Sequence, residues 1–391
     1  MDAARRRLCM VLSHVRTGFM PPSSIPAPAS SGIASFSWTT SPEPSPESKR
    51  SKKNVAVIGA GTIGKLHIEE LSAARAAGYP IRLDTVVELG ITEEDFEKLN
   101  GLEPDGSTVL INERLGFNDL AARLVERNVS LVINSASDAV AHEISEALIR
   151  VKIPYVVAEK AGAPTSERMK DLGRLAEANN VEFGIKYQKI HHPEFAKIIE
   201  KASQFKSRIG QDGTRVQIDM SACDTNEPVV QPGRQFQLAN QGGHLFSLAT
   251  AFEEALGVHF NRFDATTDQG DTWDDSSYSS VTMCTSDFKV ICRLCMSRTT
   301  SGKSRDTLWV RLFEADKKTR PVETQTLEAV QEGDGWKTMW GQAFRAQMFA
   351  ICESVVSGSR IVGTAVTGAD QAARVLRYAT YSKESAQAKR K

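Results

Sequence analysis

The sequence lacks an excess of charge and lacks long apolar runs. Over its 391 residues, 48 Lys and Arg balance 48 Asp and Glu, so the formal net charge is zero. Nucleic acids and anionic membranes attract basic proteins, and this balance argues against both as partners. No apolar run in the sequence approaches the roughly 18 residues that a membrane-spanning helix requires. We therefore expect a small-molecule substrate, with no nucleic acid and no membrane as partner.

Cysteine is also scarce, and its six residues offer little to a metal site. Only Cys292 and Cys295 form a Cys-x-x-Cys pair, and the surrounding run from Phe288 to Met296 is strand-like. Residues three apart on a strand point to opposite faces, and no second pair follows at zinc spacing. The acidic stretch 268–275 matches no metal-loop spacing either. We expect no metal, and small buried thiols in a reducing compartment.

The first 53 residues have little that could form a hydrophobic core. Seven of the fifteen prolines fall between Pro21 and Pro46, mixed with Ser and Ala. This composition predicts a disordered N-terminal extension over residues 1–53. The first twenty residues carry four arginines and a single acid, interleaved with apolar residues. Mitochondrial import is therefore the alternative to the cytoplasmic location that we otherwise expect.

After the extension, strand-like apolar runs alternate with helical patterns. Segments such as Val55–Ile58 and Leu131–Asn134 read as buried strands between helices. This alternation predicts a Rossmann-type, doubly wound parallel sheet over residues 54–189, with ligands at the carboxyl ends of its strands. From residue 190 to residue 391 several strands follow one another, which predicts an α+β domain with a mostly antiparallel open sheet and helices. The predicted fold class is thus α/β followed by α+β, in two domains.

The most informative segment lies at the start of this alternation. A strand-like run over residues 55–58 opens it, and Gly59, Gly61 and Gly64 follow before a helical pattern. In a dinucleotide-binding unit such glycines allow a tight turn, close approach of a pyrophosphate and close packing of helix on strand. Free amides at the helix start then bind the phosphates.

Glu88 ends the second predicted strand, where a carboxylate accepts hydrogen bonds from the hydroxyls of the adenosine ribose. Its charge would repel a 2′-phosphate, and residues 89–92 offer no Arg or Lys to receive one. The expected cofactor is therefore NAD, with NADP as the alternative. An ordinary surface acid before a turn is the other interpretation of Glu88.

Two short segments carry candidate catalytic residues. Glu159 and Lys160 directly follow a predicted buried strand, where a lysine is rarely found without a partner. At the carboxyl edge of the sheet, Lys160 would lie beside the nicotinamide and share its proton with a substrate hydroxyl, oriented by Glu159. His244 follows Gly242 and Gly243 near the start of a helix and is a candidate acid or base near neutral pH. A solvated Glu-Lys pair and a structural histidine are the alternatives.

Together these segments resemble the Gfo/Idh/MocA family of NAD(P)-dependent oxidoreductases, which act mainly on sugars and polyols. The resemblance covers about residues 54–387 and rests on four motifs in order. The motifs are the glycine fingerprint followed by His67, Glu159-Lys160 preceded by His142, Gly184-Ile-Lys-Tyr-Gln-Lys189, and Asn240-Gln-Gly-Gly-His244.

The resemblance implies a role for each matching residue. Lys160 and His244 would be the catalytic pair, with His244 removing the hydroxyl proton as hydride leaves the same carbon for the nicotinamide. The cofactor-binding residues would be Gly59, Gly61, Thr62, Ile63, Gly64, Glu88, Ser135, His142, Glu159 and Lys160. The substrate-binding residues would be Lys189, Asn240 and His244. The C-terminal sheet would form the interface of a homodimer or homotetramer.

Several positions depart from the family pattern, among them Ser135-Ala136, where Thr-Pro is common. Asn240 stands where Asp is usual, and an amide can orient His244 without stabilising its protonated form. A comparable change in a hydrolase triad costs roughly ten-thousandfold in rate. Ala161 replaces the usual proline after Lys160, and Lys189 replaces an arginine, which keeps the charge but loses bidentate geometry. We therefore expect a substrate other than the commonest one of the family.

The sequence thus predicts an NAD(P)-dependent dehydrogenase or reductase acting on a hydroxyl or carbonyl carbon of a sugar, polyol or related small molecule. A non-catalytic dinucleotide-binding sensor or repressor of the same fold is one alternative. The presence of both Lys160 and His244 argues against it, and Asn240 argues weakly for it. The other alternative is a lyase or glycosidase that uses tightly bound NAD, from which the cofactor would co-purify.

Overall fold

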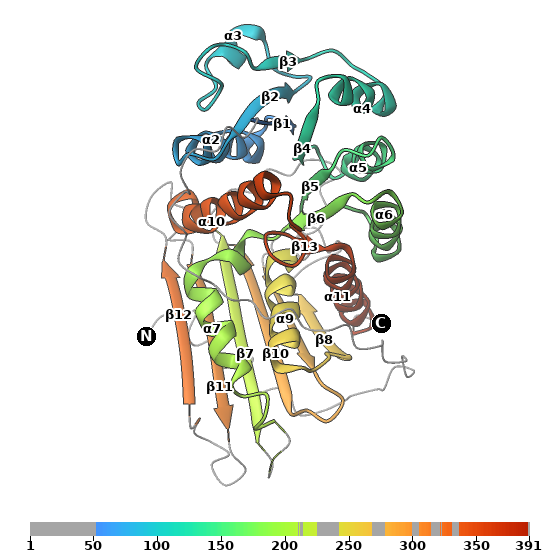
Figure 1. Ribbon diagram of the computed structural model, residues 1–391. Coiled ribbons are helices and arrows are strands. Elements are labelled where there is room, and N and C mark those ends of the chain that lie inside the picture. The colour runs from blue at the N-terminus through green and yellow to red at the C-terminus, as the bar shows by residue number, and fades with distance from the viewer. Residues whose placement is uncertain are drawn as a thin grey trace. The chain divides into compact units, whose positions relative to one another are not determined.

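The computed structural model describes residues 52–209, 211, 214–224, 242–267, 278–298, 305–313, 321, 323–330 and 336–389. These residues form two β-sheets and the helices that cover them (Figure 1). Nearly all of the predicted extension lies outside this part of the chain, as do Asn240 and the acidic stretch 268–275. The interpretations given to those residues stay predictions.

The first sheet is a largely parallel one. Its strands are β1 (Lys53–Ile58), β2 (Ile81–Val87), β3 (Val109–Ile111), β4 (Val129–Asn134), β5 (Tyr155–Glu159), β6 (Glu182–Lys186) and β13 (Thr367–Gly368). They lie in the order β13-β6-β5-β4-β1-β2-β3. All neighbouring pairs are parallel except β13 with β6. The predicted doubly wound parallel sheet is confirmed.

Helices cover both faces of this sheet. Successive residues of a strand point to opposite faces, so the apolar strands pack against helices on both sides. The helices of this half are α2 (Thr62–Ala76), α3 (Glu93–Glu97), α4 (Phe117–Glu126), α5 (Ala141–Arg150) and α6 (Ser166–Asn179). On β1, Ala56 and Ile58 pack with residues of α4, α5 and α6. Val55 and Val57, on the other face, pack with α2 and with α10 (Trp336–Ser357) (Figure 1).

The second sheet is mostly antiparallel. Its strands are β7 (Arg215–Asp224), β8 (Arg262–Thr267), β9 (Tyr278–Cys284), β10 (Val290–Arg298), β11 (Arg305–Phe313) and β12 (Glu323–Val330), in the order β12-β11-β7-β10-β9-β8. The class of sheet is as predicted, but β7 and β10 run parallel to each other. Alternating polarity along a strand reports which face is buried and carries no information about direction.

Several helices lie over one face of the second sheet (Figure 1). They are α7 (Pro193–Ser203), α9 (Gly242–Leu256) and α11 (Ala369–Ala388), and the short 3-10 helix η1 (Gln188–His191) precedes α7. The C-terminal helix α11 contacts α6 of the first half as well as α9 and β8 of the second. Because β13 also joins the edge of the first sheet, residues near the end of the chain contribute to both halves. The domain boundary at residue 189 stays a prediction.

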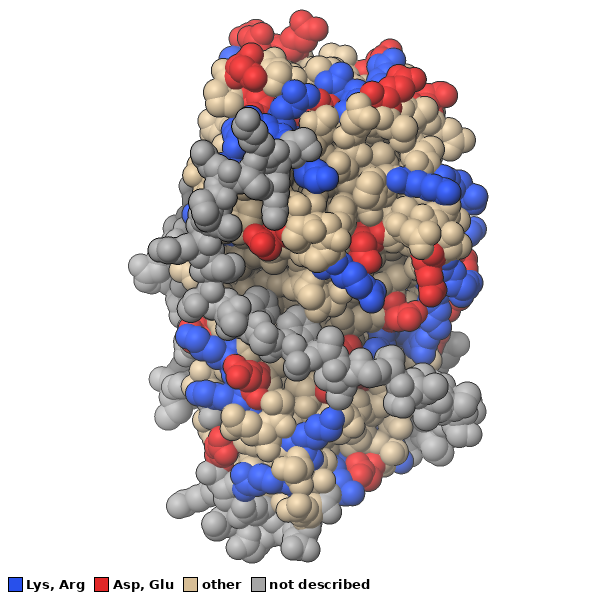
Figure 2. Space-filling view, in the orientation of Figure 1, with Lys and Arg blue, Asp and Glu red and all other residues tan. Residues whose placement is uncertain are grey.

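The length and polarity of the described helices, and the charges on the surface, indicate which partners the protein could bind. None of the helices in the described ranges is long and apolar enough to cross a membrane. Acidic and basic side chains are interspersed on the face of the molecule drawn in Figure 2. Many charged side chains of the described residues pair locally, such as Arg150 with Glu146 at 2.6 Å and Lys197 with Glu194 at 2.7 Å.

The glycine turn supplies a test of the packing between α2 and β1. In Gly64→Ala the new Cβ would lie 1.7 Å from the backbone oxygen of Gly59, so helix and strand must separate. We expect the free energy of unfolding to fall by about 2 kcal/mol or more, as for other insertions into packed regions. Thermal denaturation measures the loss as a lower Tm. The control is Gly61→Ala, because nothing lies within 4 Å of its Cβ position, and it should melt like the wild type. A Gly64→Ala protein with an unchanged Tm would contradict this packing.

Candidate active site

Most of the predicted site residues follow the carboxyl ends of parallel strands. The glycine turn follows β1, Glu88 follows β2, Ser135 follows β4, and Lys160 follows β5. The register places Ile58 beside both Val87 and Asn134, so these ends meet at one edge of the sheet. Along that edge, the glycine turn follows β1 on one side of β4, and Lys160 follows β5 on the other side of β4.

The glycine turn has the geometry that a phosphate-binding loop requires. Gly59 has a φ of +85°, and a Cβ there would lie 2.6 Å from the backbone oxygen of Ser135. The Ser135 hydroxyl donates a hydrogen bond to the Gly59 carbonyl oxygen at 3.3 Å. Thr62 opens α2, and the residue before it, Gly61, provides no side-chain cap for the first-turn amides. Nothing lies within 4 Å of a Cβ on Gly61, so a pyrophosphate could approach the backbone here.

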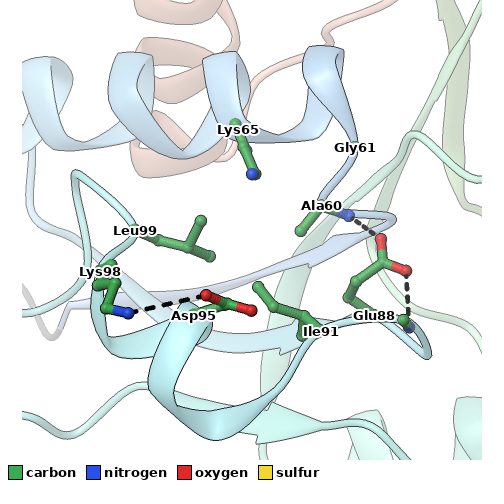
Figure 3. A pocket seen from close by; sticks show the side chains of 9 residues that line it. Ala60, Gly61, Lys65, Glu88, Ile91, Asp95, Lys98 and Leu99 are labelled. Carbon is green, nitrogen blue, oxygen red and sulfur yellow. Dashed lines mark hydrogen bonds and ion pairs between the residues drawn. The ribbon is translucent and has the colours of Figure 1, made fainter.

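A cavity of about 450 Å³ adjoins this turn (Figure 3). It is lined by Ala60, Gly61, Lys65, Glu88, Gly90, Ile91, Asp95, Lys98 and Leu99. One carboxylate oxygen of Glu88 accepts a 2.6 Å hydrogen bond from the Ala60 amide. The other oxygen accepts a 3.2 Å hydrogen bond from the Gly90 amide. Glu88 is therefore held at the cavity wall beside the glycine turn, which is where the ribose of a dinucleotide would need an acceptor.

Two lysines also line this cavity, and the sequence analysis assigned no role to them. Lys65 comes from α2 and points into the cavity, whereas Lys98 comes from α3 (Figure 3). The ammonium of Lys98 lies 2.6 Å from Glu94 and 3.9 Å from Asp95. The cavity therefore holds cations as well as the Glu88 carboxylate. The sequence did contain a signal that could have identified Lys65. This residue directly follows Gly64, in the first turn of a helix that was expected to face the cofactor.

On the other side of the edge, Lys160, Lys189 and His244 come together. A Cβ on Gly243, the residue before His244, would lie 3.9 Å from Cδ of Lys160. The ammonium of Lys189 lies 4.4 Å from the centre of the Trp340 ring, and Lys189 is buried. The charges of both lysines act on His244. Three of the residues predicted from separate motifs are thus neighbours.

His244 is held in its neutral form. It is buried in the first turn of α9. Burial lowers its pKa well below the ordinary value, and the charges of Lys160 and Lys189 lower it further. Its Nε2 lies 3.5 Å from Nε2 of Gln188, and its Nδ1 has no hydrogen-bond partner among the described residues. The amide nitrogen of Gln188 can only donate, so Nε2 of His244 is the unprotonated nitrogen and the ring proton lies on Nδ1. A neutral imidazole thus keeps one nitrogen that can act as a general base.

Tyr187 and Gln188 belong to the same cluster and were not singled out from the sequence. The Tyr187 ring meets His244 edge-on, with centroids 6.4 Å apart. Burial, together with the charges of Asp138 and Glu159, raises the pKa of Tyr187, so its phenol stays protonated. The Tyr187 hydroxyl and Oε1 of Gln188 are buried and have no hydrogen-bond partner in the described part of the chain. Buried polar atoms are rarely left unpaired, so these atoms point to a polar ligand.

Glu159 is hydrogen-bonded to His67. Its Oε1 lies 2.7 Å from Nε2 of His67, and Nδ1 of that ring lies 3.2 Å from Nζ of Lys186. Burial tends to raise the pKa of Glu159, but the hydrogen bond from His67 and nearby positive charges outweigh it and hold the pKa below its usual value. Burial and the charge of Lys186 lower the pKa of His67 to about 4.

His142 lies in the first turn of α5, where its Nδ1 is 2.8 Å from Oε2 of Glu143. The cofactor-binding role of His142 stays a prediction, and so does the substrate-binding role of Asn240. The cysteines Cys284, Cys292, Cys295 and Cys352 are free thiols. Within the described ranges, no three or more His, Cys, Asp or Glu side chains are grouped so as to hold a metal ion.

Comparison with known proteins supports the fold. No protein-family model and no curated protein matches the chain. It is similar to a probable dehydrogenase from Thermotoga maritima, with 15% identity, a TM-score of 0.66, and coverage of 86% of this chain and 97% of that one. It is also similar to a scyllo-inositol dehydrogenase from Lactobacillus casei solved with NAD(H) and scyllo-inositol, with 13% identity, a TM-score of 0.65, and coverage of 86% and 98%. A third similar structure is GenD2 from gentamicin A biosynthesis, in complex with NAD. Its identity is 16% and its TM-score is 0.67, and the match covers 88% of this chain and 97% of that one. The chain therefore shares the fold of these three proteins.

Proposed function

We propose that this protein is an NAD(P)-dependent dehydrogenase or reductase acting on a hydroxyl or carbonyl carbon of a sugar, polyol or related small molecule. The observation that carries the proposal is the convergence of Lys160, Lys189 and His244 at the sheet edge that also presents the glycine turn. The similar fold of a dehydrogenase that was solved with NAD(H) and a polyol supports this substrate class.

The residues around the turn fit a dinucleotide. Open space at Gly61, a first turn of α2 without a side-chain cap, and the fixed carboxylate of Glu88 are the features that its pyrophosphate and ribose need. A bound nicotinamide cofactor would accept hydride in the oxidative direction and donate it in the reductive one. Glu88 supports NAD as the cofactor, and the nearby Lys65 keeps NADP as the alternative.

The side chains on the opposite side of the edge would handle the substrate and its proton. Lys160 would donate a hydrogen bond to the reacting oxygen and hold it in place. His244, neutral at physiological pH, would accept the hydroxyl proton during oxidation and return it during reduction. The unpaired polar atoms of Tyr187 and Gln188 would bind further hydroxyl groups of the substrate.

The remaining partners are proposals of the same kind. We expect a second copy of the chain to bind through the second sheet, whose helices lie over one face (Figure 1), giving a homodimer or homotetramer. A cytoplasmic location is proposed, with mitochondrial import as the alternative.

Removal of the Lys160 side chain tests the proposed chemistry. We expect Lys160→Ala to lower kcat by about a hundredfold or more, the usual loss for a group that assists proton transfer. Its Kd for NADH, measured by fluorescence, should stay within a few-fold of the wild type, because the glycine turn lies on other strands. Absorbance at the nicotinamide band, with NAD and NADP each tested against sugars, polyols and their oxidised forms, measures turnover. The control Lys197→Ala removes an exposed lysine on α7 and should be fully active.

Normal turnover in Lys160→Ala would show that the active site is wrongly placed. Tight dinucleotide binding without turnover of any substrate by the wild type would favour a sensor or repressor. Cofactor that co-purifies, with substrate consumed and no net NADH released, would favour a lyase or glycosidase with tightly bound NAD.

Neutralisation of Glu88 tests the choice of cofactor. In Glu88→Gln the side chain keeps its length but loses the charge that repels a 2′-phosphate. We expect NAD to bind about tenfold more weakly, as when a hydrogen bond to a charged group is lost, and NADP to bind more tightly. Isothermal titration of both dinucleotides measures the two changes. Glu97→Gln, an exposed change on the neighbouring α3, should alter neither. An unchanged ratio of the two Kd values in Glu88→Gln would remove Glu88 from the determinants of specificity.

A further inference from the structure

A lysine, a histidine and a glutamate form a buried chain behind the proposed active site. Nζ of Lys186 lies 3.2 Å from Nδ1 of His67, and Nε2 of His67 lies 2.7 Å from Oε1 of Glu159. Lys186 and His67 have no exposed surface, and the Glu159 side chain is 12% exposed. The next residue after Glu159 is Lys160, which the proposed mechanism places on the substrate.

The topology explains how these groups meet. Glu159 ends β5 and Lys186 ends β6, and the parallel register pairs the two residues directly. Register partners point to the same face of a sheet, and here that face is covered by α2, which carries His67. The imidazole therefore spans two side chains from neighbouring strands.

The hydrogen bonds define the state of each group. An ammonium can only donate, so Nδ1 of His67 must accept from Lys186, and the ring proton must lie on Nε2. Nε2 then donates to the Glu159 carboxylate. The three hydrogen-bonded side chains are thus the Lys186 cation, the neutral His67 ring and the Glu159 anion, in that order. Lys186 and His67 are fully buried, so the chain can hold the Glu159 carboxylate in one orientation.

Burying an ammonium is costly, so Lys186 needs an explanation. The groups that face it are His67 and Glu70 from α2, Glu159 from β5, Cys352 and the Phe344 ring from α10, and His191 from η1. Burial raises the pKa of Cys352 to about 12, and burial with the charge of Lys186 lowers that of His191 to about 3, so neither carries charge near neutral pH. Glu70 is paired with Arg345 at 2.9 Å. Burial lowers the pKa of Lys186 to about 8, although the charges of Glu159 and Glu70 oppose this.

We propose that Lys186 is a positioning residue that acts through His67 to fix the Glu159 carboxylate, and with it the backbone that presents Lys160 to the substrate. This inference rests on the proposed function. Lys186 touches neither cofactor nor substrate in this proposal, so its loss should change kcat while leaving dinucleotide binding intact. The effect should also fade at alkaline pH, where the wild type itself loses the Lys186 proton.

The test compares Lys186→Met with the wild type from pH 7 to pH 9.5. Methionine is unbranched like lysine, one atom shorter, and suits a buried site. Because it removes only the cation and leaves the Glu159 carboxylate buried, it should lower the stability of the fold, so kcat is compared on protein shown to be folded by its thermal denaturation curve. We expect kcat to fall about tenfold at pH 7, since small misplacements of reacting groups have effects of this size. The ratio of the wild-type kcat to that of Lys186→Met should fall between pH 7 and pH 9.5, and the Kd for NADH should change less than twofold. Lys186→Gln, which keeps a donor that does not titrate, should recover part of the loss at pH 7.

The outcomes separate this role from a structural one. Lys197→Met makes the same change at an exposed site and should leave kcat unaltered. A Lys186→Met protein with wild-type kcat, or a ratio that stays constant across the pH range, would overturn the inference.

A second measurement does not depend on turnover. Nitrogen NMR of ring-labelled histidine, assigned with His67→Gln, should show the Nε2–H tautomer of His67 in the wild type. The Nδ1 signal should shift as pH passes about 8, and this shift should be absent from Lys186→Met. An Nδ1–H tautomer in the wild type would overturn the inference. Absence of turnover from the wild type would instead refute the proposed function, and the ring signals would still decide whether Lys186 acts on His67.

Discussion

Parallel pairing of β1, β2, β4, β5 and β6 places the carboxyl ends of five strands along one edge, and the candidate site depends on that alignment. Neighbouring strands in a parallel ladder run in one direction, so the residues that follow them arrive at the same place. The glycine turn, Glu88, Ser135 and Lys160 reach this edge from distant parts of the chain. The second half of the chain supplies the remaining side, because α9 carries His244 against Lys160 and Tyr187.

Burial of charge gives the site its chemical character. Lys160 and Lys189 act on a buried His244 and keep its imidazole neutral, which leaves a nitrogen able to accept a proton. On the other face of β5 and β6, Lys186 and Glu159 are separated by the neutral ring of His67. Both arrangements combine a buried imidazole with lysine charges, but the first lies beside unpaired polar atoms of Tyr187 and Gln188, and the second is enclosed by α2 and α10. Reactivity is therefore expected from the first cluster and rigidity from the second.

The features that could be predicted are those that depend on residues close together in the sequence. The glycine fingerprint is a contiguous signal of strand, turn and helix, and the structure places Gly59, Gly61 and Gly64 in that arrangement. Glu88 could be placed beside the glycine turn because it directly follows a strand. Lys65 and Lys98 could not, because their entry into the same cavity depends on how α2 and α3 are packed. The parallel pairing of β7 with β10 was also beyond sequence patterns, since these strands are joined through long-range contacts.

The sequence by itself determined the alternation of strands and helices, the glycine turn after β1 and the identity of the polar residues that end each strand. These follow from periodicity and from conformational preferences of residues close together in the chain. Only the tertiary structure decided which of those residues became neighbours. It joined Lys160 to His244, and it turned Glu159 toward His67 and Lys186. The physical reason is that side-chain partners are chosen by strand register and by the packing of helices on the sheet, and both depend on contacts between residues far apart in sequence.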